Sequence, residues 1–186
     1  MASSVYKKRL CRTRKSVAEK DNTEENTDSL LSLDQKGLAL KSALPEILSA
    51  FNHEVEVDLD IVSIKIAAEN IKSACLELRN NDDLSFDYLL LLCVVDYEEY
   101  LQVVYFLYST SKKHIVTLKV DLSPDDPSIN SVTSVWPGAN WYERESHDLF
   151  GVFFVGHPNL KPLLLYDGFE GYPGRKSFAF NDYEDW

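Results

Sequence analysis

The chain has 186 residues, of which 45% are hydrophobic and 12% aromatic, so it is long enough for one folded domain and too apolar for a disordered chain. Its formal net charge is −11, and because the first 20 residues carry +6 the remainder carries −17, which argues against nucleic acid as a partner. Three scattered cysteines (Cys11, Cys75 and Cys93) are too few for a disulfide framework, a metal knuckle or a tetra-thiolate iron–sulfur cluster.

The first elements in chain order are a polar tail, a helix and a strand. Residues 1–35 are mostly polar and charged and lack hydrophobic periodicity, which predicts a mobile N-terminal tail. Apolar residues at helical spacing over 38–51 predict a helix, with Pro45 opening a second helical segment. Apolar and acidic residues alternate over 55–66 with a slip in phase at 61–62, which predicts one half-buried strand with a bulge or bend near its middle.

The middle of the chain reads as a second helix followed by three strands. Residues 67–79 place their apolar side chains on one helical face, and the asparagine pair at 80–81 is expected to end that helix. Three apolar segments follow, at 88–95, 101–108 and 115–122, and their links are too short for parallel crossovers. We therefore predict an α+β fold with a mainly antiparallel four-stranded sheet and helices on one face. No apolar run approaches the ~20 residues that a membrane-spanning helix needs.

The last third of the chain ends in a segment without a core of its own. A helical turn over 131–136 is followed by a helix that Asn140 is expected to cap and Gly151 to end, and then by a short edge strand at 152–155. The remainder is rich in glycine, proline and aromatic residues, which predicts an extended tail that lies along another surface. The chain thus divides into a mobile N-terminal tail (1–35), an α+β domain (36–157) and an extended partner-binding tail (158–186).

The helix that precedes Gly151 contains the most informative cluster of charged residues. Its ionisable residues are Glu143, Arg144, Glu145, His147 and Asp148. Arg144 and Asp148 are i,i+4 neighbours, so paired charges are expected on adjacent ridges of the helix. The cluster is either a solvated helix surface with ion pairs or a polar network that docks a partner subunit, since aromatic residues around charged anchors are typical of interfaces.

The same carboxylates, with His147 and His157, are the residue types that metal sites and acid–base pairs use. Their spacing does not match a zinc-binding helix, which places two histidines four residues apart with a glutamate between them. The glycine-rich segment 168–177 does not match a phosphate loop, because Arg175 separates the last glycine from the lysine. We therefore predict no catalytic, cofactor-binding or metal-binding residue in this chain. A free-standing enzyme that uses these carboxylates is the competing hypothesis.

Four blocks of residues resemble one known family. They are 125–127 (DDP), 131–145, which reads SVTSVWPGANWYERE, 147–151 (HDLFG) and 156–160 (GHPNL). Weaker similarity extends upstream, and the whole match covers roughly residues 40–178. The chain is similar to the 30-kDa subunit of respiratory complex I, the NADH–quinone oxidoreductase.

The resemblance implies a non-catalytic subunit of the peripheral arm, at the cytoplasmic face of the cell membrane. Such a subunit binds the 49-kDa subunit and other peripheral-arm subunits. There it scaffolds the quinone-reducing module during electron transfer from NADH to quinone coupled to proton translocation. The chain itself is expected to bind no cofactor, with FMN, iron–sulfur clusters and quinone in partner subunits, and to reach the membrane only through the complex.

The resemblance also assigns the residues of the signature and the subunit interface. They are Trp136, Trp141, Glu143, Arg144, Glu145, His147, Asp148, Phe150, Gly151, His157, Pro158, Arg175 and Lys176. The tail departs from the family pattern, since Pro162 stands where the family usually has arginine. The alternative is therefore the equivalent subunit of a membrane-bound hydrogenase, a formate hydrogenlyase or another complex I relative with a different electron donor.

Overall fold

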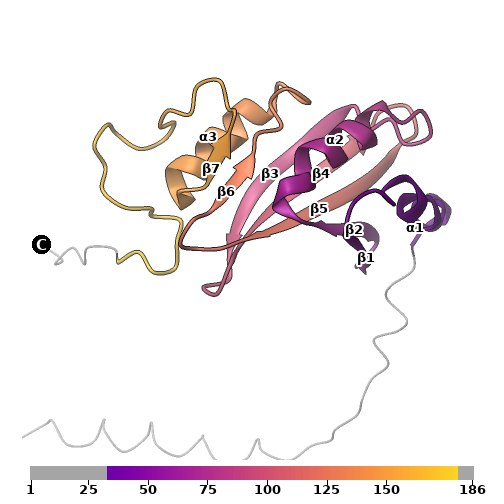
Figure 1. The fold of residues 1–186 in the computed structure, drawn as a ribbon, viewed down its shortest axis with the longest axis horizontal. Helices are drawn as coiled ribbons and strands as arrows, with labels where there is room; N and C mark the ends of the chain where they lie inside the picture. The colour runs from indigo at the N-terminus through magenta and orange to yellow at the C-terminus, as the bar shows by residue number, and fades with distance from the viewer. Residues whose placement is uncertain (1–32, 180–186) are drawn as a thin grey trace, which may run out of the picture. The chain divides into compact units, whose positions relative to one another are not determined.

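The computed structural model describes residues 33–179, and the outer parts of both predicted tails lie outside this range. Its helices are α1 (Gln35–Ile47), a short 3-10 helix (Ala68–Asn70), α2 (Ile71–Asn80) and α3 (Ala139–Phe150). Its strands are β1 (His53–Asp58), β2 (Ile61–Ile66), β3 (Tyr88–Asp96), β4 (Leu101–Ser109), β5 (His114–Leu122), β6 (Ser128–Asn130) and β7 (Phe153–Val155). Figure 1 shows their arrangement, in which the main sheet has the order β1-β2-β5-β4-β3 and β6 pairs with β7.

The fold class is α+β, but the main sheet has five strands and not the four predicted. The phase slip at 61–62 marks a reversal of the chain: Asp58 pairs with Ile61, and Leu59 takes a left-handed φ of 58° in the turn between them. A two-residue turn of this kind usually contains glycine or asparagine, and the chain has Leu59-Asp60 there. One predicted bent strand is therefore the antiparallel hairpin β1–β2, and β2 pairs in parallel with β5.

Helix α1 continues through Pro45, so the predicted second helical segment at this proline is wrong. The side chain of Asp34 caps the helix by accepting a hydrogen bond from the Gly37 backbone N–H. Leu44 and Leu48 have no exposed surface, and their burial outweighs the backbone hydrogen bond that proline cannot donate in the last turn.

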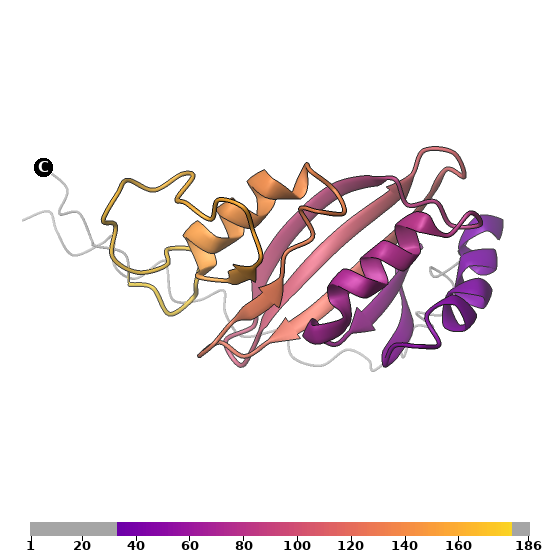
Figure 2. The ribbon, with the colours of Figure 1, turned by 45° about the horizontal axis from the view of Figure 1, so that its top comes forward.

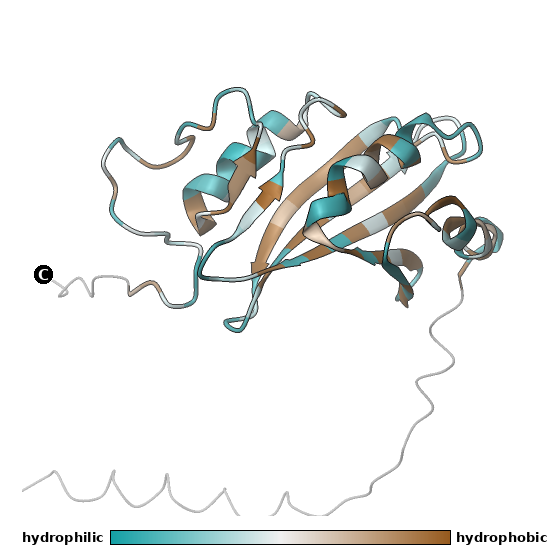
Figure 3. Cartoon of the chain, in the orientation of Figure 1, coloured by the Kyte–Doolittle hydropathy of each residue, from teal (hydrophilic) through white to brown (hydrophobic). Residues whose placement is uncertain are grey.

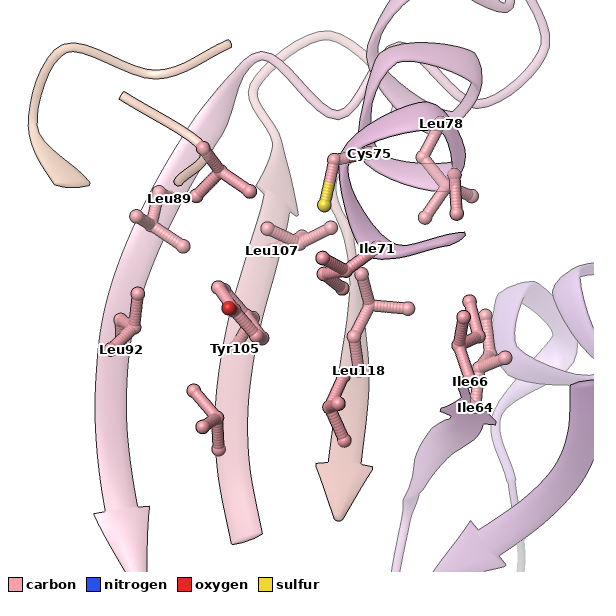
Figure 4. Packing of buried hydrophobic residues seen from close by; sticks show 14 of the residues in the cluster. Ile64, Ile66, Ile71, Cys75, Leu78, Leu89, Leu92, Tyr105, Leu107 and Leu118 are labelled. Atoms are coloured by element: carbon pink, nitrogen blue, oxygen red, sulfur yellow. The ribbon is translucent and has the colours of Figure 1, made fainter. Parts of the chain in front are cut away.

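The core lies between the inner face of the main sheet and the helices α1 and α2, which cover that face (Figures 1 and 2). Figure 4 shows Ile71 and Cys75 of α2 on the side of the helix that faces Tyr105 of β4 and Leu118 of β5, with Leu78 further along the helix. All five side chains have no exposed surface. Figure 3 shows that β3 and β4 are mostly hydrophobic along their length, as the apolar runs in the sequence predict.

The segment that carries α3 packs against β3, which is an edge strand of the main sheet. The helix ends at Gly151 as predicted, with a left-handed φ of 73°, and a side chain there would collide with the ring of Tyr172. Asn140 does not cap the helix: the N-cap is Gly138, and the helix has already begun at Ala139. Within residues 33–179, no helix has both the length and the apolar character that crossing a bilayer requires.

Two leucines of α2 test the core directly. Leu78 is fully buried and Leu76 is 40% exposed, so their replacement by alanine alters the same helix on opposite faces. Leu78→Ala should lower the free energy of unfolding by about 2–5 kcal/mol because it leaves a cavity, and Leu76→Ala by less than about 1 kcal/mol. Urea unfolding followed by circular dichroism measures both, and equal losses would contradict the observed packing of α2.

Candidate functional site

Helix α3 is anchored on its inner side by one buried carboxylate. Glu143 has no exposed surface, and its two oxygens accept hydrogen bonds from the Ser131 hydroxyl (2.7 Å) and the Val132 backbone N–H (2.8 Å). These donors lie in residues 131–138, which lead into α3 and are called the approach segment. Glu143 therefore ties the helix to this approach segment. In the described part of the chain, no lysine, arginine or histidine bonds to this carboxylate.

The surroundings of Glu143 favour its neutral form. Burial raises the pKa of Glu143 to about 7, and the bonds from Ser131 and Val132 limit the rise. The Cys75 thiol and the Tyr105 hydroxyl are also buried near it. Burial is the main cause that raises the pKa of each; the Glu143 charge raises the pKa of Cys75 further, and Cys75 and Glu143 raise that of Tyr105 further. The Tyr105 hydroxyl has no hydrogen-bond partner in the described structure. This corner of the core therefore holds three ionisable groups and, among residues 33–179, no compensating cation.

On its outer side, α3 holds the following tail through Asp148. One oxygen of this carboxylate accepts hydrogen bonds from three successive backbone N–H groups, those of residues 163–165, at 3.0, 2.7 and 2.9 Å. Burial alone would raise the pKa of Asp148, but these three bonds and the nearby His147 outweigh it, and the pKa lies below its ordinary value. Asp148 is therefore a charged anchor for the tail.

Arg144 makes the second attachment between α3 and the tail. Its guanidinium donates to the backbone carbonyls of Lys161 (3.0 Å) and Pro162 (2.9 Å) and lies 5.5 Å from the ring centre of Trp141. Trp141 itself is 63% exposed. One arginine thus positions the tail and supports an exposed aromatic side chain on the same helix.

The ion pairs expected between i,i+4 neighbours on α3 do not form. The ion pairs within residues 33–179 are Lys65–Asp121, Lys119–Asp58 and Lys176–Glu98, and none involves α3. Arg144 and Asp148 instead bind backbone groups of the tail, because those groups lack a regular secondary-structure partner and the charged side chains satisfy them. The interpretation of α3 as a solvated surface helix with ion pairs between its side chains is therefore wrong.

The histidines near α3 are used in backbone contacts. His157 donates from Nε2 to the Asn140 carbonyl (3.3 Å) and accepts at Nδ1 from the Asn159 N–H (3.0 Å), which fixes its neutral tautomer. Burial is the main cause that lowers the pKa of His157. His147 bonds through Nδ1 to the Val152 carbonyl at 3.0 Å. No group of three or more His, Cys, Asp or Glu residues in the described chain is arranged to hold a metal ion.

Arg175 and Lys176 fasten the end of the tail. The Arg175 guanidinium donates to the carbonyls of Phe150 (2.7 Å) and Pro124 (3.0 Å) and lies over the ring of Tyr172. The Lys176 backbone N–H donates to the Asp96 carboxylate at 2.8 Å. These contacts join the tail to the end of α3 and to the end of β3.

The remaining residues that the sequence predicts for the site are buried, partly buried or exposed. Trp136 is buried, and its indole N–H donates to the Phe86 carbonyl at 3.1 Å. Phe150 is partly buried and packs closely on Gly174, where a side chain would collide with its ring. Glu145 and Pro158 are exposed. The structure thus gathers most of the predicted residues around α3, and among them Arg144, Asp148 and Arg175 hold the chain's own tail.

Sequence reasoning missed Ser131, Tyr172 and the backbone of 161–165. Ser131 lies within the block that resembles the family, but nothing in its surroundings indicates that it donates to a buried glutamate. The backbone groups carry no residue-specific signal at all, because every residue other than proline has the same N–H and C=O.

The comparison with family models decides which family this is. The model for the respiratory-chain NADH dehydrogenase 30-kDa subunit matches residues 64–184. The chain belongs to this family. The match begins within β2 and includes α2, the three long strands and the whole of α3.

Two proteins similar to this chain are named as subunits of NADH-quinone oxidoreductase. A subunit of the NADH-quinone oxidoreductase of Roseiflexus castenholzii is 41% identical over 140 residues, which cover 74% of this chain and 78% of the relative. An NADH-quinone oxidoreductase subunit of Rhizobium meliloti is 38% identical over 148 residues, which cover 76% of this chain and 81% of the relative.

Two solved structures share the fold. A trypsin-resistant fragment of Nqo5 is 28% identical with a TM-score of 0.55, and the match covers 65% of this chain and 98% of the fragment. A chain of the membrane-bound sulfane sulfur reductase, an archaeal respiratory membrane complex, is 24% identical with a TM-score of 0.64, and the match covers 75% of this chain and 85% of that one. The second likeness is one of fold alone.

Removing the Asp148 carboxylate should release the tail from α3. Asp148→Ala leaves three backbone N–H groups without an acceptor, so we expect faster hydrogen exchange at the amides of 163–165 and a loss of stability of about 1–3 kcal/mol. Glu145→Ala, an exposed change on the same helix, is the matched control and should leave both unchanged. Unaltered exchange in Asp148→Ala would contradict the attachment.

Glu143 should make the folded chain less stable as the pH rises from about 5 to about 8. The unfolded chain loses this proton near the ordinary value of 4.5 and the folded chain near 7, so the folded state binds more protons in between and rising pH disfavours it. Glu143→Gln cannot ionise and should gain up to about 3 kcal/mol over the wild type across this range. Urea unfolding of both proteins at about pH 5 and about pH 8 measures the difference between their free energies of unfolding. The same difference at both pH values would mean that Glu143 ionises at its ordinary pKa and would contradict the prediction.

Proposed function

We propose that the chain is a non-catalytic peripheral-arm subunit of an NADH–quinone oxidoreductase. In this role it scaffolds the quinone-reducing module by contacting the 49-kDa-like chain, and it sits at the cytoplasmic face of the membrane, which it reaches only through the complex. Its contribution to electron transfer from NADH to quinone, coupled to proton translocation, is positional. FMN, the iron–sulfur clusters and quinone are held by partner subunits.

The observation that carries this proposal is the set of exposed apolar side chains held in place around α3. Trp141 is 63% exposed and is supported by Arg144, while Leu164 is 60% exposed and its backbone is fixed by Asp148. Tyr166, two residues further on, is 71% exposed. Large apolar groups on a pre-ordered surface lose little conformational entropy on binding, and aromatic residues of this kind dominate the energetics of protein interfaces.

The hydrogen bonds of the polar residues around α3 support a role in positioning other subunits rather than in catalysis. Glu143, Asp148 and His157 would be the natural acid–base groups, and each is engaged with groups of this chain's own backbone. A general acid or base needs an approach for substrate within hydrogen-bond reach. Glu143, which has the most perturbed pKa of the three, has no exposed surface through which a substrate could reach it.

The names of the relatives favour NADH as the electron source over the alternative donors. Proteins that are 35–41% identical to this chain are named as subunits of NADH-quinone oxidoreductase. The likeness to the sulfane sulfur reductase chain lies in the fold, so it does not favour a hydrogenase-type relative.

The role of the exposed aromatic surface can be tested in the assembled complex. Trp141→Ala should weaken binding to the 49-kDa-like chain about 10- to 100-fold, because the indole is a rigid exposed anchor, and should change the stability of the free chain by less than about 1 kcal/mol. Co-expression of the full subunits followed by native gel electrophoresis and pull-down measures assembly.

Leu38→Ala is the matched control, since Leu38 is 55% exposed on α1, outside the α3 region. It should assemble like the wild type. Normal assembly and activity of the Trp141→Ala complex would contradict the proposed docking surface, and turnover of NADH or quinone by the isolated chain would contradict the non-catalytic role.

A further inference from the structure

A short chain of hydroxyl groups connects the buried Glu143 to Thr133, a partly buried residue. The Ser131 oxygen lies 2.7 Å from one Glu143 oxygen and 2.8 Å from the hydroxyl oxygen of Thr133. Ser131 is buried, whereas Thr133 is only partly buried. A carboxyl group with no exposed surface thus has a continuous hydrogen-bonded route toward solvent.

This route can satisfy both protonation states of Glu143. When the carboxylate is charged, Ser131 donates its proton to it and accepts from the Thr133 hydroxyl. When Glu143 is protonated, the two bonds reverse: the carboxylic acid donates to Ser131, and Ser131 donates to Thr133. The Thr133 backbone N–H donates to the Ser131 oxygen at 3.2 Å in either case, and the second Glu143 oxygen keeps the Val132 N–H. The change therefore leaves the carboxyl group and the Ser131 hydroxyl paired in both states.

Among residues 33–179, the other groups that face Glu143 supply no opposing charge. Cys75 of α2 and Tyr105 of β4 are fully buried, and burial keeps both neutral. Arg79, at the end of α2, directs its guanidinium to the Val135 carbonyl and not to the carboxylate. Proton uptake is therefore the available route for neutralising Glu143.

We propose that Glu143 is a proton-binding site that exchanges with solvent through Ser131 and Thr133, and that its occupancy adjusts how firmly α3 holds Val132. Hydronium supplies the proton: it protonates Thr133 as Thr133 passes its own proton to Ser131 and Ser131 passes its own to Glu143. Release runs in the opposite direction. The bond from Val132 is stronger to a carboxylate than to a neutral acid, so the approach segment of α3 responds to pH. This property goes beyond the proposed scaffold role and does not depend on it.

The carboxyl carbon of Glu143, followed by NMR in the full chain labelled with ¹³C-glutamate, reports its protonation directly. In the wild type we expect a midpoint near pH 7, with the Val132 amide shift changing at the same midpoint. Glu143→Gln assigns the signal and should abolish the change at Val132. Glu145→Gln, an exposed change on the same helix, is the matched control and should leave the change at Val132 intact.

Two variants of the hydroxyl chain should move the midpoint in opposite directions. Ser131→Ala removes a hydrogen bond from both forms of Glu143, but the bond to the charged form is the stronger, so the midpoint should rise by about one pH unit. Thr133→Val removes a bond from both states, but in the charged state the Ser131 oxygen still accepts from the backbone N–H of residue 133, whereas in the protonated state the Ser131 O–H loses its acceptor; the midpoint should therefore fall by about the same amount.

A wild-type midpoint below about pH 5.5 would overturn the site. Shifts of both variants in the same direction, or no shift in either, would overturn the route through the hydroxyls. If Ser131→Ala does not fold, the wild type and Thr133→Val decide between the same outcomes.

Discussion

The attachment of the C-terminal segment to α3 is the contact on which the candidate site depends. Three successive amides converge on one oxygen of Asp148, and the two preceding carbonyls are held by Arg144. A segment rich in glycine and proline has no regular hydrogen bonds of its own, so these charged side chains replace the missing secondary structure. On the opposite side, Glu143 fixes the same helix to the segment that precedes it. Helix α3 therefore orders the chain on both sides of itself.

This arrangement explains why the charged residues of the family signature can be structural. The conformational entropy of the tail is lost when the chain folds, and a surface already ordered binds a partner at lower cost. Trp141 and Leu164 are consequently presented as fixed apolar groups. Membership of the 30-kDa subunit family follows from the match over residues 64–184. The docking of this surface on a 49-kDa-like chain is the proposal built on it.

Much of the fold could be predicted from periodicity. The apolar face of α2, the end of α3 at Gly151 and the three long strands are all visible in the sequence, because burial and glycine geometry leave a residue-specific pattern. The β1–β2 hairpin was not visible, because its turn at Leu59-Asp60 has no glycine or asparagine to mark it. Nor were the partners of Arg144 and Asp148, since helical spacing predicts side-chain pairs and gives no signal for backbone groups distant in sequence.

The most direct measurement of the central claim is an experimental structure of the assembled complex that contains this chain. The bonds from Asp148 and Arg144 to residues 161–165 should persist there, and Trp141 and Leu164 should lie buried against the 49-kDa-like chain. A complex in which the tail has left α3, or in which Trp141 and Leu164 remain exposed to solvent, would contradict this claim.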